Sequence, residues 1–262
     1  MEVTYADNKI ADIGKVSFNG SGNAILRTLP QTMGTLINPS LNPNRSMSVA
    51  CNYFLQNKTK NQMEQIQYLM GNYFSSCPLP NRDLTVNENT YANVTIINNT
   101  FDIITNNTYC NFKLNVLMDH LQPFFDSKIP NTQVRTGTFE YNWVDAANVQ
   151  HVTTFPIINN YEAAPSISFT KHSKPRNHLA DGQTNSYIGG FHSIKLECWI
   201  SGCLVKDMES YAANALIGPL GRQGTLSISG RTFEDAILNN FTSSEHNASN
   251  MRYTMEFIST QC

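Results

Sequence analysis

Reactive side chains occur in this chain, but their spacing completes none of the common catalytic or metal-binding motifs. Cys198 and Cys203 lie close in sequence, yet no second close pair of Cys or His completes a tetrahedral zinc site. The glycines of residues 218–224 lack the Lys-Ser/Thr pair of a phosphate-binding loop, and no Gly-x-Ser-x-Gly elbow occurs. Asp119 and His120 could supply half of a general-base arrangement, but the sequence places no nucleophile beside them. We therefore expect no catalytic residue, no metal site and no cofactor, and we do not expect an enzyme.

A basic segment is the other candidate for binding chemistry. Lys171, His172, Lys174 and Arg176 are nearly consecutive, and they could contact a phosphate. They could equally lie on a solvated loop that meets a neighbouring subunit. A charge cluster alone is weak evidence for a ligand, so we favour the loop contact.

Charge and cysteine usage narrow the class of protein. The formal net charge is −2, which predicts no strong general attraction to nucleic acid or to an anionic membrane. The six cysteines are scattered, and the amino terminus has neither the basic nor the apolar region of a secretory signal. We therefore expect free thiols, with no disulfide framework and no membrane association.

The strongest pattern in the sequence is an internal repeat. Residues 46–54 and 193–200 both alternate apolar with polar residues, and they place Cys51 and Cys198 at matching positions. Further matches pair residues 16–18 with 167–169, Met63 with Met208, 84–86 with 226–228, Tyr91 with Phe233, and 110–116 with 251–257. Because order, spacing and side-chain face agree, we predict two tandem copies of one small β-rich domain.

Both copies have the same predicted order of elements: a strand, a long loop, a strand, a helix and three more strands. In the first copy the strands are 15–19, 46–54, 84–86, 92–97 and 109–117, and the helix is 59–73. The second copy opens with an additional hairpin (133–143 and 149–157), followed by strands 166–170, 193–200, 226–229, 233–238 and 251–258 and by helix 206–217.

These elements predict a mainly β fold of the α+β type. We expect two tandem β-sandwich or barrel domains, each with one packed α-helix. The first domain is predicted to cover residues 1–118 and the second residues 133–262, and a Pro-containing connector spans 119–132.

The repeated unit resembles the tail-tube domain shared by phage tail tubes, distal tail proteins, baseplate hubs and the inner tubes of contractile injection systems. The layout of elements in both copies carries the likeness, together with the phrase Ser229-Gly230-Arg231-Thr232-Phe233 before a strand. In that family six domains form a ring around a lumen, and there is no active site. The resemblance implies a structural ring component of a tailed-phage tail: a tail tube, a distal tail protein or a baseplate hub.

Two copies of the domain in one chain imply a homotrimer that forms a pseudo-hexameric ring. The partners implied are other copies of the chain and neighbouring tail or baseplate proteins, with DNA only passing through the lumen and no membrane. The implied location is the virion, after assembly in the host cytoplasm.

Two long segments follow the first strand of each copy, at residues 29–44 and 171–190. Connections longer than about 12–15 residues are uncommon in compact domains unless they are functional. We predict that both are unstructured loops that contact the next ring and become ordered only there. The candidate interaction residues are Asn38, Asn42 and Asn44 in the first loop and Lys171, His172, Lys174 and Arg176 in the second. The basic residues are expected to face acidic groups of a partner protein rather than lumenal DNA.

A receptor- or carbohydrate-binding β-sandwich module on a virion or cell surface is the alternative. Such a module is expected to present exposed aromatic platforms on its loops. Trp143 and Trp199 both fall in predicted strands, which favours the ring protein.

Overall fold

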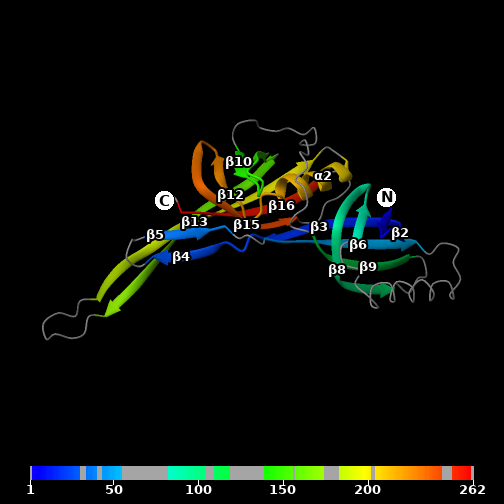
Figure 1. Ribbon diagram of the computed structural model, residues 1–262, viewed down its shortest axis with the longest axis horizontal. Helices are drawn as coiled ribbons and strands as arrows, with labels where there is room; N and C mark the ends of the chain where they lie inside the picture. Colours follow the sequence, from blue (N-terminus) through cyan, green and yellow to red (C-terminus); the bar gives the residue numbers. More distant parts are fainter. Residues whose placement is uncertain are drawn as a thin grey trace.

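The chain is built almost entirely from antiparallel strands (Figure 1), so the mainly β class is confirmed. The computed structural model describes residues 2–29, 34–39, 43–54, 82–103, 109–118, 139–155, 157–173, 183–201, 204–243 and 250–260. The strands of the first half are β1 (Val3–Tyr5), β2 (Asn8–Ala11), β3 (Ile13–Ser21), β4 (Ile25–Leu29), β5 (Gly34–Asn38), β6 (Asn44–Phe54), β7 (Arg82–Val86), β8 (Asn89–Ile103) and β9 (Tyr109–Leu117).

The second half begins at β10 and contains all of the described helical structure. Its strands are β10 (Phe139–Val144), β11 (Gln150–Thr154), β12 (Ile157–Ser173), β13 (Gln183–Ser201), β14 (Gln223–Ile228), β15 (Arg231–Ser243) and β16 (Asn250–Ser259). Helix α2 (Val205–Tyr211) continues into a π-helical turn, η1 (Ala212–Leu216). The predicted helix 206–217 and the hairpin around the turn 145–148 are therefore confirmed, whereas the predicted helix 59–73 and the connector 119–132 lie outside the described residues.

The order of strand pairing occurs twice along the chain. In the first half the neighbours run β2-β1-β7-β8-β9-β6-β3. In the second half they run β11-β10-β14-β15-β16-β13-β12, and every pair in both series is antiparallel. Each strand of the first series thus has a counterpart in the second.

The register of the pairs repeats as well as their order. Cys51 lies opposite Phe112, and Cys198 lies opposite Tyr253, as the alignment of the two segments predicted. Both thiols are buried in the core. Leu84 pairs with Tyr91, and their predicted equivalents Leu226 and Phe233 also pair with each other.

Irregularities in the strands fall at matching positions too. Asn93 in β8 and Asp235 in β15 have positive φ angles of 55° and 56°. Each follows the first residue of its strand by four positions, and each lies beside a shift in register with the preceding strand. A bulge at this place bends the strand, so β8 and β15 each pair first with one neighbour and then with another.

The first strand of each copy was matched incorrectly from the sequence. Residues 16–18 were aligned with 167–169 because both read apolar-Ser-Phe. In the structure Phe18 lies opposite Met47, and the counterpart of Met47, Ile194, lies opposite Ala163. Residues 161–163 of β12 therefore correspond to 16–18, because the hydrogen-bond ladder rather than local similarity fixes the alignment.

The core lies between two layers of strands in the first half and extends without a break into the second. Gly14 of β3 leaves room for Val3 and Val86, because a Cβ atom there would come within 2.6 Å of the first and 2.7 Å of the second. Strand β1 and strand β7 therefore lie directly over β3. Buried apolar side chains of both halves form one cluster, in which Phe18 is in ring contact with Tyr91.

A strand junction joins the two halves. The end of β3 pairs with the end of β15, where Ser21 lies opposite Asn240 and Asn19 opposite Thr242. Two hydrogen bonds flank this ladder: Gly22 N donates to Asn239 O at 2.6 Å, and Phe18 N donates to Ser243 Oγ at 2.5 Å. The strands β12-β13-β16-β15-β3-β6-β9-β8 therefore form one uninterrupted series.

A buried polar contact fastens helix α2 to the first half. The Glu209 carboxylate is fully buried and accepts hydrogen bonds from Asn87 Nδ2 at 3.0 and 3.1 Å. The same amide also donates to Gly14 O at 3.1 Å. Buried polar groups need such partners, because leaving one unsatisfied costs about 1–3 kcal/mol.

This contact predicts a measurable loss of stability. Asn87→Gly removes the amide donor while still allowing the positive φ of 52° at this position. We expect the free energy of unfolding to fall by about 1–3 kcal/mol in denaturant titration, because the buried Glu209 carboxylate loses the hydrogen bonds from the Asn87 amide.

The neighbouring variant Glu88→Gly is the control. Glu88 also has positive φ, and its exposed carboxylate forms an ion pair with Lys206 Nζ at 2.6 Å. Exposed ion pairs contribute little, so stability should hardly change. Equal losses in the two variants would contradict the role assigned to Asn87.

Candidate functional site

The two segments predicted to be long loops are partly β-hairpins, and this corrects the sequence interpretation. Within residues 29–44, β5 pairs along its whole length with β4, from Asn38 opposite Ile25 to Gly34 opposite Leu29, and β4 lies just before this segment and shares only Leu29 with it. Within residues 171–190, β12 continues to Ser173 and β13 begins at Gln183. Asn, Gly and Pro favoured loops in the sequence, but the ladder between the two sides of each segment outweighs that preference.

The predicted interaction residues are therefore distributed along these hairpins. Asn38 is half-buried at the end of β5, and Asn44 is exposed where β6 begins, opposite Ser21. Lys171 and His172 belong to the ladder of β12, opposite Asn185 and Thr184. Asn42, Lys174 and Arg176 lie outside the described residues.

The β4–β5 hairpin packs on its own chain. Ile37 is buried in a small cluster with Ile237 of β15 and Ile258 of β16. The backbone N–H of Ala24 donates to Asn239 Oδ1 at 3.2 Å, which ties the start of the hairpin to β15. The prediction that residues 29–44 are ordered only against another protein is therefore wrong for this hairpin.

The β12–β13 hairpin projects away from the rest of the molecule. Its ladder runs from Ile157 opposite Trp199 to Ser173 opposite Gln183 (Figure 1). Near the outer end, Phe169 lies opposite Tyr187. In the first half, the counterpart of the β12–β13 hairpin has β3 and β4 on one side and β5 and β6 on the other. Each side of the β12–β13 hairpin is a single strand, whereas each side of its counterpart is divided into two.

Two long edges of the strand series are open within the described part of the chain. Strand β12 pairs only with β13, and β8, from Thr95 onward, pairs only with β9. An edge presents a row of unpaired backbone groups that can pair with another strand. These edges are the counterparts of the two that meet in the junction, since β12 corresponds to β3 and β8 to β15.

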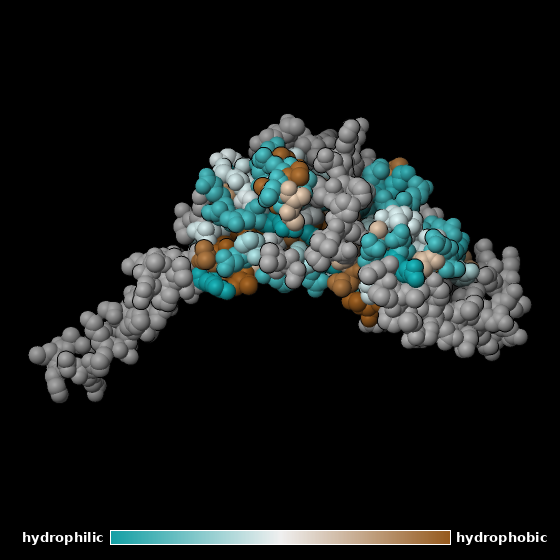
Figure 2. Space-filling model, in the orientation of Figure 1, coloured by the Kyte–Doolittle hydropathy of each residue, from teal (hydrophilic) through white to brown (hydrophobic). Residues whose placement is uncertain are grey.

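Exposed apolar side chains accompany these edges. Figure 2 shows hydrophobic residues gathered at two places along the lower side of the molecule, one over the β4–β5 hairpin and one beside β8. Leu26 and Leu36 of the hairpin are exposed. Ile97 of β8 and Leu117 of β9 are 61% and 41% exposed. Exposed apolar surface next to an open edge is typical of a protein interface.

The middle of the outer face of the strand series is polar, whereas the exposed apolar residues Ile13, Phe54 and Leu117 lie on the same face near the strand ends. One row across β3, β6 and β9 consists of Ser17, Ser48 and Asn115, and Ser48 Oγ donates to Asn115 Oδ1 at 3.2 Å. In the second half, Glu197 is paired with Arg252 Nη2 at 3.1 Å and with Lys195 Nζ at 3.7 Å. This face therefore carries hydroxyls, amides and paired charges.

A shallow depression of about 430 Å³ lies over the junction on this face. Lys195, Asn240 and Glu256 are among the residues that line it. Glu256 Oε2 accepts from Asn240 Nδ2 at 2.6 Å, and its Oε1 accepts from Ser193 Oγ at 3.3 Å. The carboxylate is thus engaged with the protein itself.

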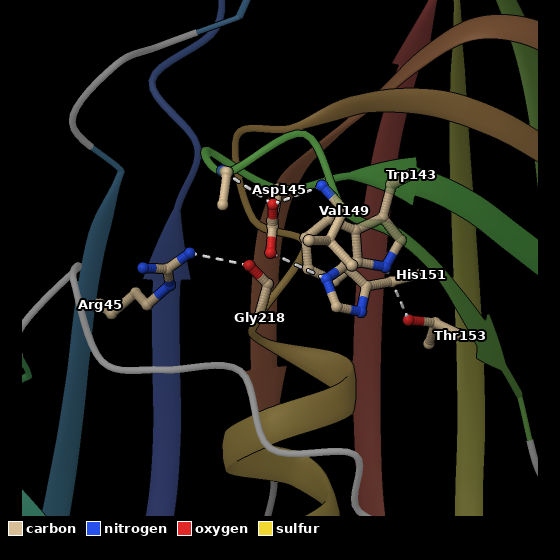
Figure 3. Close-up of polar contacts among 8 residues, drawn as sticks. Arg45, Trp143, Asp145, Val149, His151, Thr153 and Gly218 are labelled. Atoms are coloured by element: carbon tan, nitrogen blue, oxygen red, sulfur yellow. Dashed lines mark hydrogen bonds and ion pairs between the residues drawn. The ribbon is translucent and has the colours of Figure 1, made fainter.

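A cluster of titratable and aromatic side chains lies on the β10–β11 hairpin (Figure 3). Asp145 Oδ2 lies 2.9 Å from His151 Nε2, and the His151 ring stacks on Trp143 at 4.7 Å between centroids. Asp145 Oδ1 accepts from the backbone N–H groups of Ala147 and Val149 at 2.8 and 2.9 Å. The hydrogen bond to His151, followed by the one from Val149, lowers the pKa of the Asp145 carboxyl.

Hydrogen bonds also connect this cluster to η1. Trp143 Nε1 donates to Thr153 Oγ1 at 3.1 Å, and Thr153 Oγ1 donates to Ala215 O at 3.0 Å. Arg45 of the first half donates to Gly218 O at 2.8 Å nearby. These contacts fix the turn and connect the β10–β11 hairpin to η1.

No group of three or more His, Cys, Asp or Glu side chains in the described ranges is placed to hold a metal ion. No helix in the described part of the chain is long and apolar enough to cross a membrane.

Comparisons with known proteins give only distant likenesses. No protein-family model and no curated protein matches the chain. Among solved structures, the chain is similar to the SPP1 Dit (gp 19.1) protein, described as a paradigm of the hub adsorption apparatus in phages that infect Gram-positive bacteria. That similarity has 10% identity, covers 98% of both chains and has a TM-score of 0.33.

A second similar structure is the active form of the Rv3671c protease from M. tuberculosis. It is 9% identical, with 94% of this chain and 75% of the protease chain covered and a TM-score of 0.15. Both TM-scores lie below 0.5, so neither likeness assigns a fold or a function to this chain.

The buried positions of Cys51 and Cys198 lead to a chemical prediction. Burial raises the pKa of the Cys51 and Cys198 thiols to about 12. At pH 8, roughly one molecule in ten thousand would then carry the reactive thiolate at either position. We expect iodoacetamide to leave both cysteines unmodified in the folded protein, as measured by peptide mass spectrometry.

The control is the same reaction in guanidinium chloride, where both thiols should be alkylated. Rapid alkylation of one cysteine but not the other in the folded protein would contradict their equivalent positions in the core.

Proposed function

We propose that this protein is a structural ring component of a tailed-phage tail, in which three chains form a pseudo-sixfold ring around the DNA channel. In this proposal the chain consists of two tandem tail-tube-like domains, and it acts as a tail tube, distal tail or baseplate hub protein. Its location is the virion. It contacts further copies of itself and neighbouring tail proteins.

The observation that supports this most is the repeated pairing order together with its internal junction. Each half ends on one side in a β3-type edge and on the other in a β8-type edge. Inside the chain, one edge of each kind is used when β3 pairs with β15. The remaining two edges, β12 and β8, are of complementary kinds, so identical chains can join head to tail.

Head-to-tail joining closes into a ring when the rotation per unit divides a full turn. A rotation of one sixth per half would close the series after three chains. Closure also removes every open edge of the series, which is the arrangement that best protects a β-sheet from uncontrolled association.

The polar middle of the outer face suits the wall of such a channel. Lys15 and Lys113 flank Ala50 in the first half, and the second half pairs Lys195 with Glu197. A wall of hydroxyls, amides and mostly balanced charges would neither trap nor strongly repel a passing polyanion. DNA is therefore a transient neighbour in this proposal and not a bound ligand.

The alternative, a receptor- or carbohydrate-binding β-sandwich module, has less support among the described side chains. Trp143 is buried in β10, and Trp199 is only half-buried in β13 with the Arg252 guanidinium 5.9 Å from its ring centroid. Neither forms an exposed aromatic platform on a loop.

The proposal predicts the mass and shape of the assembled protein. We expect light scattering to give the mass of three chains of 29.4 kDa, and negative-stain images to show closed rings. Monomers at every concentration, or six chains with twelve domains in one plane, would contradict the proposal.

A further inference from the structure

We propose that β8 of one copy pairs with β12 of the next copy in the register that β15 and β3 use within the chain, and that the β12–β13 hairpin of the second copy covers Leu117 of the first. This inference rests on the self-assembly proposed above and specifies which strands meet, in which register, and what covers the apolar surface.

The internal junction supplies the register. Asn240 lies opposite Ser21, and Thr242 lies opposite Asn19. Gly22 N donates to Asn239 O. Because backbone groups of a strand alternate in direction, those of Gly20 and Phe18, two and four positions earlier in β3, also face β15. The Asn240–Ser21 and Thr242–Asn19 pairs are then the closely spaced, non-hydrogen-bonded ones.

Asn240 in the second half corresponds to Asn98 in the first half. Both follow the same shift in register, which falls between Leu238 and Asn240 in β15 and between Ile96 and Asn98 in β8. Thr100 correspondingly takes the place of Thr242.

The place of Ser21 in the first half is that of Ser166 in the second. Ser21 lies opposite Asn44, three residues before Met47, and Ser166 lies opposite Phe191, three residues before Ile194. The pairs expected between copies are therefore Asn98 with Ser166 and Thr100 with Ala164.

Pro165 of β12 is compatible with this edge and weakens it. Pro165 corresponds to Gly20 of β3, whose backbone N–H is directed toward the partner strand, and proline has no N–H to donate. Proline is tolerated in a strand where its missing donor lies on an outer edge. The junction between copies would lack one ladder hydrogen bond that the internal junction has, so it should be the weaker of the two.

Apolar surface points to the same pairing. Ile258 of β16 is only 7% exposed because the β4–β5 hairpin, through Ile37, covers it together with Ile237. The counterpart of Ile258 is Leu117, which is 41% exposed. Within the described part of the chain, no hairpin covers Leu117 as β4–β5 covers Ile258.

The missing cover is the outer part of the β12–β13 hairpin from another copy. This hairpin corresponds to the one that contains β4 and β5, and its ladder extends beyond Ser166 to Ser173, opposite Gln183. When β12 pairs with β8, the outer part of its hairpin continues past β8 toward Leu117, as the β4–β5 hairpin continues past β15 and places Ile37 against Ile258.

Paired cysteines test the register directly. The double variant Asn98→Cys/Ser166→Cys places thiols at a non-hydrogen-bonded position, where facing Cα atoms lie about 4.5 Å apart, within the range that a disulfide spans. Mild oxidation of the assembled protein should give covalent dimers and trimers on non-reducing gels.

The matched control is Asn98→Cys/Pro165→Cys, which moves one thiol by a single residue and therefore to the opposite face of the strand. It should give few cross-links, as should each single variant. Equal cross-linking in both double variants, or none in either while the protein remains assembled, would overturn the register.

Leu117→Asp tests the apolar contact. Because it removes a buried Leu from the interface and places a charge there, we expect the assembly constant to fall roughly tenfold or more. The control Val152→Asp changes a residue that is 56% exposed on β11, away from both edges, and should leave assembly unchanged.

The outcomes separate the two proposals. A wild-type protein that is monomeric throughout would overturn both the ring and the pairing. If the wild-type protein forms a ring, but Asn98→Cys/Ser166→Cys gives no cross-link and Leu117→Asp does not weaken assembly, the pairing alone is overturned. These edges would then contact another tail protein.

Discussion

Backbone hydrogen bonding at the edges of β-sheets is the constraint on which the arrangement of this molecule depends. An edge strand carries N–H and C=O groups that need partners, and a protein must pair, cover or blunt them. This chain pairs one such edge internally, where β3 meets β15, and leaves the equivalent edges on β8 and β12 without a partner in the described residues. The proposed assembly follows from that asymmetry.

The second determinant is the repeated order and register of the strand pairs. Cys51 and Cys198 occupy matching positions in the two ladders, and the bulges at Asn93 and Asp235 bend β8 and β15 at the same point. Because the bends match, the two halves present their edges in the same way. The apolar cluster also runs from one half into the other, so the halves are held together by packing as well as by the ladder.

The contacts that differ between the halves would make the internal junction stronger than the junction proposed between copies. Asn87 and Glu209 form a buried contact across it, and Arg45 donates to the end of η1. Pro165 removes a donor at the corresponding place on the open edge. A strong internal junction and a weaker external one would let the chain fold first as a single unit and assemble afterwards.

The sequence predicted those parts of the fold that depend on local pattern. Alternation of apolar and polar residues located β6 and β13 and aligned Cys51 with Cys198. Strands β1 and β2 were not predicted, because three or four residues are too few to show a period. The hairpin sides at 29–44 and 171–190 were taken for loops, since Asn, Gly and Pro conceal a ladder that only pairing reveals.

The candidate site was harder to predict because it depends on contacts between distant segments. The junction joins residues more than two hundred positions apart, such as Asn19 and Thr242, so no local sequence pattern predicts it. Residues 167–169 imitate 16–18 closely enough to mislead a local alignment. The charges of Lys171 and His172 made them candidates from the sequence alone. Ile97 and Leu117 have no such sequence signal, and only the structure shows that they are exposed beside an open edge.

Hydrogen exchange of the assembled protein tests the central claim most directly. The account predicts that amides of β8 from Thr95 to Ile103 exchange slowly in the assembled wild type, much as those of β15 do, and speed up when Leu117→Asp dissociates the assembly, while β15 stays protected by β3. Equal exchange of β8 in the assembled and dissociated forms would contradict it, because the open edge would then have no partner strand.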